Sequence, residues 1–208
     1  MFVSVSARTD NAGSLANNGT SAVSELSQLD ANQLLIGVIL AQLEGRANLP
    51  YGLGLSHEAY HELLLGLADE SLLRAEKHWQ QGGDNHIKMR AKVLAELLAM
   101  QLSEREELVC LLADYTAPDV DYSDSVAIIV ATASLSPAHL WKSLGLVSRQ
   151  QLRQLLSFFF PQLVALNHQN MRWKRFFYRC LCERSGDYVC KSPNCVDCSS
   201  YQECFSPE

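Results

Sequence analysis

The sequence lacks the features that direct a chain into or across a membrane. Residues 1–23 contain no basic stretch followed by a continuous apolar segment, which a secretory signal would require. The longest apolar run, from Leu34 to Leu43, is interrupted by Gly37 and Gln42 and is too short to span a bilayer. We therefore expect a soluble protein of the cytoplasm.

The sequence also lacks an excess of positive charge and any recognisable catalytic motif. It has 17 Lys and Arg residues against 23 Asp and Glu residues, which gives a net charge of -6. An acidic chain of this kind is not expected to bind nucleic acid broadly. No phosphate-cradling glycine loop, nucleophile elbow or Ser-His-Asp arrangement is traceable. We therefore do not expect an enzyme.

Strand patterns are scarce, whereas Leu, Ala, Glu, Gln and Lys, which favour helices, dominate the middle of the chain. The predicted fold class is all-α, with one helical domain in residues 24–186. Residues 1–23 are rich in Ser, Asn, Ala, Gly and Thr without an apolar period, which predicts a disordered tail. Residues 187–208 form a cysteine-rich segment, which needs metal ligation to become ordered.

Local signals predict where several helices begin and end. A first helix is predicted before Gly45, a residue placed where a glycine commonly ends a helix. Its signal is a set of residues at helical spacing: Leu26, Leu29, Gln33, Ile36 and Leu40. Ser56 is predicted to cap a second helix that runs through Gly66. The β-branched run 127–130 is predicted to be a short buried helix, because no partner strand is apparent.

Two further helices are predicted in the second half of the chain. Ser103 and Glu106 have the spacing of a capping box, which predicts a helix that continues to Asp114. Pro161 suits a first helical turn, and a last helix is predicted from there to Arg184. Its core-facing stripe is predicted to be Leu163, Leu166, Trp173, Phe177 and Leu181.

Cysteine is concentrated at one end of the sequence, where six of the seven residues fall in the last 29 positions. Without an export signal, these thiols are expected to stay reduced, so metal binding is the leading interpretation. Four of them follow a C-x4-C-x2-C-x5-C spacing: Cys190, Cys195, Cys198 and Cys204. Four thiolates so close together are natural ligands for an iron-sulfur centre or for zinc.

Spacing alone does not decide between these two metals. Zinc knuckles usually pair two C-x2-C units around a longer loop, whereas only the middle spacing here is x2. The first three cysteines instead repeat the spacing of plant-type ferredoxins. A zinc-stabilised module that binds protein or nucleic acid, and a redox sensor that uses reversible thiol oxidation, remain the alternatives.

A basic stretch precedes the cysteines. Residues 171–184 hold five basic residues and one acidic residue, a net charge of +4 that leaves -10 elsewhere. These basic residues could offset the negative charge of a thiolate-bound cluster and steer docking to an acidic partner. A solvated helix face fits the pattern equally well. The basic residues are Arg172, Lys174, Arg175, Arg179 and Arg184.

Four stretches in and after this basic region are distinctive: MRWKRFFYR at 171–179, LCE at 181–183, CKSPNCVDC at 190–198 and YQECF at 201–205. Together they resemble the NifQ family of molybdenum donors in nitrogen fixation. HLW at 139–141, LGL at 144–146, Phe160-Pro161 and Asn167 also look like that family.

This resemblance implies a carrier of a molybdenum-iron-sulfur cluster, built on an iron-sulfur precursor with molybdenum from molybdate. The family's motif cysteines carry over onto Cys190, Cys195, Cys198 and Cys204. The implied partners are the nitrogenase cofactor-assembly scaffold and the nitrogenase iron protein, with no membrane or nucleic acid.

Other residues are candidates for accessory roles only. His139 and His168 could supply a nitrogen ligand to molybdenum, and Cys182 could be an auxiliary ligand. Cys180 is predicted to be a small buried hydrophobe, and Cys110, between Val109 and Leu111, is predicted to lie in the core.

Overall fold

The computed structural model describes residues 26–185, which fold into helices without any β-strand in that range. The all-α fold class is therefore confirmed. Residues 1–23 and 187–208, predicted as a disordered tail and a cysteine-rich segment, lie outside the described residues. The elements are α1 Gln28–Leu43, η1 Tyr51–Gly54, α2 His57–Leu67, α3 Glu70–Gln80, α4 Asn85–Ala99, α5 Leu102–Ala113, α6 Ser123–Ser134, α7 Leu140–Ser143, α8 Arg149–Phe159, α9 Pro161–Leu166 and α10 Trp173–Ser185.

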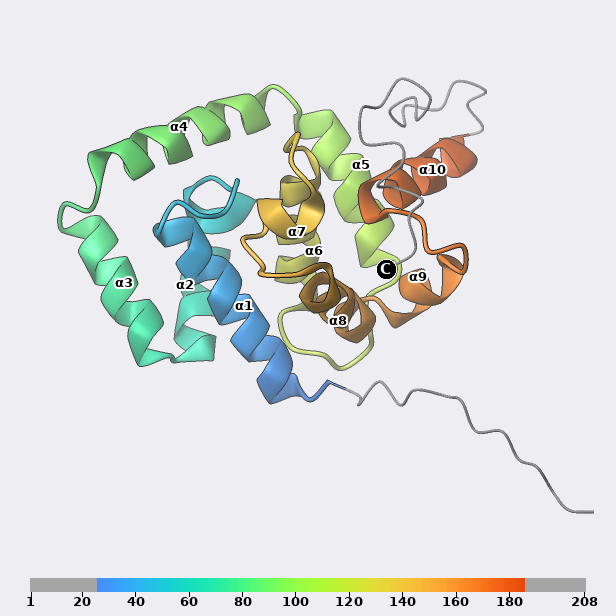
Figure 1. Ribbon diagram of the computed structural model, residues 1–208, viewed down its shortest axis with the longest axis horizontal. Helices are drawn as coiled ribbons and strands as arrows, with labels where there is room; N and C mark the ends of the chain where they lie inside the picture. Colours follow the sequence, from blue (N-terminus) through green and yellow to red (C-terminus); the bar gives the residue numbers. More distant parts are fainter. Residues whose placement is uncertain (1–25, 186–208) are drawn as a thin grey trace, which may run out of the picture.

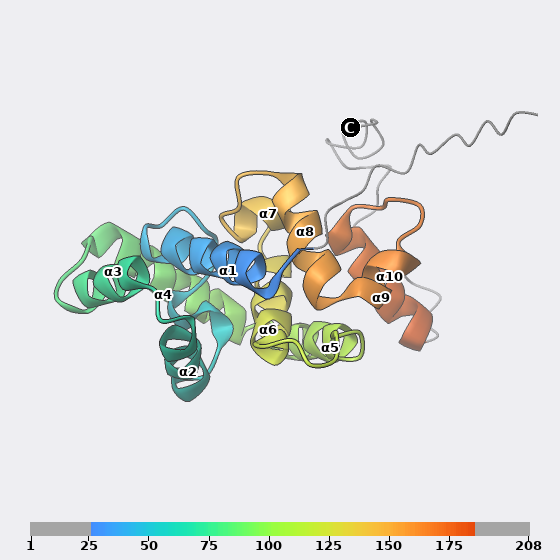
Figure 2. The ribbon, with the colours of Figure 1, turned by 90° about the horizontal axis from the view of Figure 1, so that it is seen from below.

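The helices form a body with two distinct ends (Figures 1 and 2). Both views place α2, α3 and α4 at one end and α9 and α10 at the other, with α1, α6, α7 and α8 between them. Helix α5 follows α4 directly and packs against both α6 and α10. Helix α5 thus provides one of the contacts that hold α10, the last described helix, on the domain.

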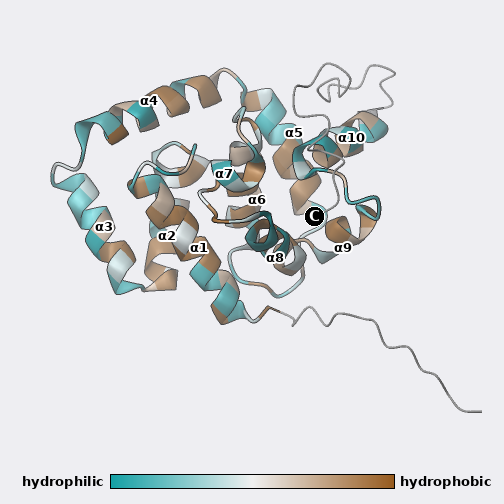
Figure 3. Ribbon diagram, in the orientation of Figure 1, coloured by the Kyte–Doolittle hydropathy of each residue, from teal (hydrophilic) through white to brown (hydrophobic). Residues whose placement is uncertain are grey.

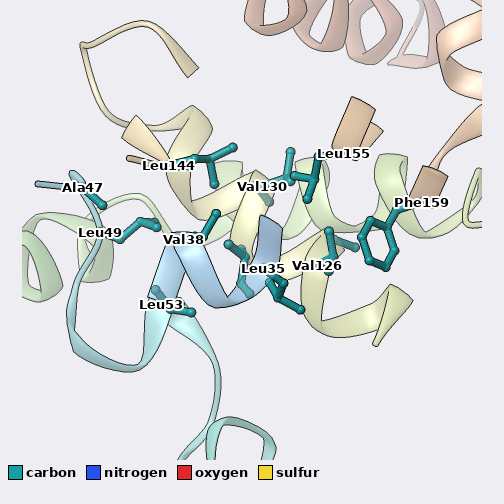
Figure 4. Packing of buried hydrophobic residues seen from close by; sticks show 14 of the residues in the cluster. Leu35, Val38, Ala47, Leu49, Leu53, Val126, Val130, Leu144, Leu155 and Phe159 are labelled. Atoms are coloured by element: carbon teal, nitrogen blue, oxygen red, sulfur yellow. The ribbon is translucent and has the colours of Figure 1, made fainter. Parts of the chain in front are cut away.

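The core lies where α1, α6 and α8 meet (Figure 4). Burial of each large apolar side chain contributes on the order of 1.5–3 kcal/mol. Helix α6 is buried along most of its length, which confirms the buried helix predicted at 127–130. The labelled residues of these three helices are each at most 1% exposed: Leu35, Val38, Val126, Val130, Leu155 and Phe159.

Helix α1 begins and ends through local chemistry. Ser27 caps it, and the side chains of Ser27 and Asp30 form a reciprocal capping box. At its other end, Gly45 has a φ of +73°, and its amide donates to the Gln42 carbonyl. The Arg46 amide donates to Ala41, which completes a Schellman motif. The predicted role of Gly45 is confirmed.

The predicted start of α2 is confirmed, whereas that of α5 is wrong in detail. Ser56 caps α2 by accepting from the Ala59 amide at 3.1 Å. Helix α5 begins at Leu102, so Ser103 lies inside the first turn, and the N-cap residue Gln101 makes no side-chain capping bond. Only two residues separate α4 from α5, so the chain has already turned into α5 before Ser103.

The single helix predicted from Pro161 to Arg184 is wrong, because the structure breaks it into α9 and α10. Pro161 does occupy the first turn of α9. The break follows from Asn167, whose side chain accepts from the Met171 amide and donates to the Met171 carbonyl, both at 2.8 Å. These bonds compete with helical backbone pairing and close a loop in which Asn170 has a φ of +50°.

Candidate metal-cluster site

Helix α10 is the last described element before the cysteine-rich segment. It ends at Ser185, five residues before Cys190. The four predicted ligands, Cys190, Cys195, Cys198 and Cys204, lie outside the described residues, so their ligation stays a prediction. The described residues determine how α10 is held and therefore where the chain enters that segment.

Aromatic side chains fix α10 on the domain. Phe177 is fully buried, and Phe176 and Tyr178 are buried beside it. The Trp173 ring meets the Phe176 ring edge to face, with 6.0 Å between centroids. The predicted stripe is right for Phe177 and for the buried Leu163, but Leu166 is 49% exposed. That difference follows from the break between α9 and α10.

Lys174 ties the start of α10 to the segment before α7. Its Nζ donates to the backbone carbonyls of Ser136 and Ala138, the latter at 2.5 Å. Burial lowers the pKa of Lys174 to about 8, because the ammonium form loses water. The two carbonyl oxygens favour the same ammonium form, so they offset part of its desolvation.

Arg172 makes a second connection to the same region. Its Nη1 lies 3.3 Å from Nδ1 and 3.5 Å from Nε2 of His139, which precedes α7. The guanidinium nitrogen is thus close to both ring nitrogens, which places the cation against the imidazole. The candidate ligand His139 is thus half-buried and faces an arginine.

Two ion pairs involve the basic residues nearer the end of α10. Arg184 pairs with Asp114 at 2.7 Å, and its guanidinium lies over the Tyr115 ring, 5.5 Å from the centroid. Arg179 pairs with Glu183 of its own helix at 2.7 Å. Both pairs are solvent-exposed, and each contributes on the order of 0–1 kcal/mol.

Tyr178 makes a further contact with α5. Its hydroxyl donates to the carboxylate of Glu104, 74 positions earlier in the sequence. Burial, followed by the neighbouring Glu104, raises the pKa of Tyr178, so the hydroxyl keeps its proton. Sequence reasoning missed Glu104, Asp114 and the Ser136 and Ala138 carbonyls, because no local signal marks residues that meet α10 only through the fold.

The remaining candidates occupy different environments. His168 is exposed on the loop after α9, with Nδ1 3.1 Å from the Leu166 carbonyl oxygen. Cys182 and Cys180 are both half-buried on α10. Burial raises the pKa of Cys180, and the residue packs against the core, much as predicted. Cys110 is exposed, so its predicted place in the core is wrong.

Within residues 26–185, no three His, Cys, Asp or Glu side chains gather closely enough to hold a metal ion. Over the same range, none of the helices combines the length and apolar character needed to cross a lipid bilayer.

Fold and site together define a class of protein: a helical domain whose last described helix, α10, leads into a segment with four cysteines. The chain belongs to the NifQ family, whose model matches residues 34–206 and so includes all four of those cysteines. The family resemblance in the sequence is thereby confirmed.

Relatives support the same assignment. Protein NifQ of Azotobacter vinelandii is 41% identical over 179 residues, 86% of this chain and 90% of the relative. Protein NifQ of Klebsiella pneumoniae is 38% identical over 164 residues, 77% of this chain and 90% of the relative. A NifQ homolog of Sinorhizobium fredii is 48% identical over 79 residues, 38% of this chain and 34% of the relative. No solved structure matches the chain significantly.

Proposed function

We propose that this chain carries a molybdenum-iron-sulfur cluster and donates its molybdenum for synthesis of the nitrogenase iron-molybdenum cofactor. Membership of the NifQ family supports a role in nitrogen fixation related to molybdenum processing. The observation that carries the finer proposal is the C-x4-C-x2-C-x5-C spacing, which lies inside the range matched by the family.

The cluster is cargo in this proposal, and the cysteine thiolates are its ligands. Soft sulfur anions suit iron-sulfur clusters, and a set of four within 15 residues binds cooperatively. Helix α10 presents the segment from a fixed base, since Phe177 and Lys174 hold the helix on the domain. The ligands are Cys190, Cys195, Cys198 and Cys204.

The proposal includes delivery without substrate turnover. The cluster would form from an iron-sulfur precursor and molybdenum supplied as molybdate, in the cytoplasm. Its recipients would be the cofactor-assembly scaffold and the nitrogenase iron protein. His139, His168 and Cys182 are candidates for accessory ligation, and among them His139 would first have to leave its contact with Arg172.

Anaerobic purification with elemental analysis tests the proposal. The full chain should be brown and contain iron, sulfide and molybdenum. Cys195→Ala should lose most of the iron and molybdenum together, because one of four thiolates is removed. A colourless protein that contains only zinc would refute the proposal and favour the zinc-stabilised module.

The chain offers a matched control for this experiment. Cys110 is exposed on α5, away from the four-cysteine segment in the sequence. Cys110→Ala should therefore retain iron and molybdenum at the level of the unchanged chain. Equal metal loss in both variants would show that the assay responds to damage in general and not to the ligand set.

A further inference from the structure

Helix α4 carries an apolar face that the rest of the described chain does not cover. Only Ala91 of its 15 residues is buried. Four large apolar residues, which we call the α4 stripe, are strongly exposed: Met89 (64%), Val93 (46%), Leu97 (52%) and Met100 (82%). Their spacing places them along one face of the helix, and Figure 3 shows hydrophobic residues along α4.

The orientation of the α4 stripe is fixed by contacts elsewhere on the helix. The Arg90 guanidinium donates to the Gly45 carbonyl and to the Asn48 side chain, which holds α4 against the loop after α1. The Lys88 ammonium lies over the Trp79 ring, 5.9 Å from its centroid. The stripe therefore faces outward as part of the fold and not because the helix has frayed.

The α4 stripe is large for an isolated surface feature. It extends over 12 positions, from Met89 to Met100, about 16 Å of helix at about 1.5 Å per residue. By contrast, Leu65 and Leu73 are each the one large apolar residue that is strongly exposed on α2 and on α3, respectively. Single exposed apolar residues are ordinary, whereas a contiguous apolar face marks an interaction surface.

Two opposite charges border the stripe on one side. Lys92 and Glu96 are exposed and lie one helical turn apart. Neither has an ion pair or a side-chain hydrogen bond within residues 26–185. The flank of the stripe thus presents a positive charge toward the start of α4 and a negative charge toward its end.

We propose that the α4 stripe is a homodimer interface in which α4 packs antiparallel against α4 of a second copy. Two-fold symmetry suits the spacing, because Met89 then meets the partner's Met100 and Val93 meets the partner's Leu97. The same register brings Lys92 beside the partner's Glu96, twice per dimer. A parallel arrangement would instead place like charges together, so charge complementarity selects the antiparallel one.

Sedimentation equilibrium of the full chain, kept anaerobic and reduced so that cysteines do not cross-link, tests this proposal. We expect a concentration-dependent dimer. Leu97→Gln should raise the dimer dissociation constant by about tenfold or more, because both copies lose an apolar contact. Leu65→Gln on α2, an equally polar change at an exposed leucine outside the stripe, should leave it unchanged.

A charge exchange tests the register of the two helices. Lys92→Glu and Glu96→Lys should each weaken the dimer, because each change places like charges across the interface. The two changes together should restore the dissociation constant to within a few-fold of the original. Lys77→Glu on α3 is the control for net charge. Circular dichroism must show unchanged helix content in every variant.

Three outcomes would overturn the proposal. The first is a chain that stays monomeric at all accessible concentrations. The second is a dimer that is insensitive to Leu97→Gln, which would place the contact elsewhere, for example at the cysteine-rich segment. The third is a double charge exchange that remains as weak as the single changes, which would exclude the antiparallel register.

Discussion

Lys174 is a half-buried ammonium, and its removal should change how the stability of the fold depends on pH. In the folded chain it is enclosed at the start of α10, where it donates to the Ser136 and Ala138 carbonyls. Lys174→Met keeps a similar side-chain volume but removes both the charge and the donor. At neutral pH two effects oppose each other: two carbonyls lose their partner, while an ammonium no longer has to be desolvated. The pH dependence separates them.

The direction in which stability changes with pH follows from the lowered pKa of Lys174. Well below pH 8 the Lys174 ammonium is protonated in both folded and unfolded chains, so its burial cost is fully present. Between about 8 and the ordinary value of 10.5, the folded chain binds fewer protons than the unfolded chain, so stability rises with pH. The full rise is about 3 kcal/mol, at about 1.4 kcal/mol for each tenfold change in proton affinity.

Urea unfolding at two pH values measures this rise. The free energy of unfolding of the unchanged chain relative to Lys174→Met should increase by about 2 kcal/mol between pH 7 and pH 9.5. Tyrosines and cysteines titrate in both proteins and cancel in the difference. Lys77→Met, at an exposed lysine on α3, should show no such increase. A difference that stays constant with pH would refute the burial of a charged Lys174.

Two further substitutions test packing that positions α7 and α10. Gly145 has a φ of +72°, and a Cβ there would lie 2.3 Å from the Ala41 Cβ. Gly145→Ala should therefore lower the free energy of unfolding in urea by about 2–4 kcal/mol. Gly37→Ala, at a helical glycine with open space around it, should stabilise the chain slightly, and equal effects of the two changes would contradict the contact. Tyr178→Phe removes the hydroxyl that donates to Glu104 and should lower the free energy of unfolding by about 1–2 kcal/mol, measured as a lower melting temperature. An unchanged melting temperature would show that this hydrogen bond does not contribute to stability.

Local signals in the sequence predicted helix ends well where the chemistry is local. Ser56 and Gly45 act through backbone groups within five residues, so their roles could be predicted without knowledge of the fold. The break at Asn167 could not be predicted in the same way. The helical period continues through it, and only the paired bonds from Asn167 to Met171 reveal that the chain turns.

The error at Cys110 has a different cause. Apolar neighbours at positions 109 and 111 indicated burial, but adjacent residues on a helix point in different directions. In α5 the buried residues are Leu108, Leu111 and Leu112, and Cys110 lies on the opposite, exposed face. Whether Cys110 is buried depends on which face of α5 it lies on, and the identity of its two sequence neighbours does not show that.

Tertiary contacts also change the meaning of the basic stretch at 171–184. Counted along the sequence, it carries a net charge of +4. The fold brings Asp114 against Arg184, and the ammonium of Lys174 is enclosed by carbonyls. A considerable part of the basic charge is therefore engaged in contacts within the domain, and steering of an acidic partner is weaker than the sequence count implies. The two interpretations of the basic residues, a solvated helix face and a docking surface for an acidic partner, therefore each describe α10 only in part. The function of α10 in our proposal is mechanical: it fixes the point from which the four-cysteine segment extends.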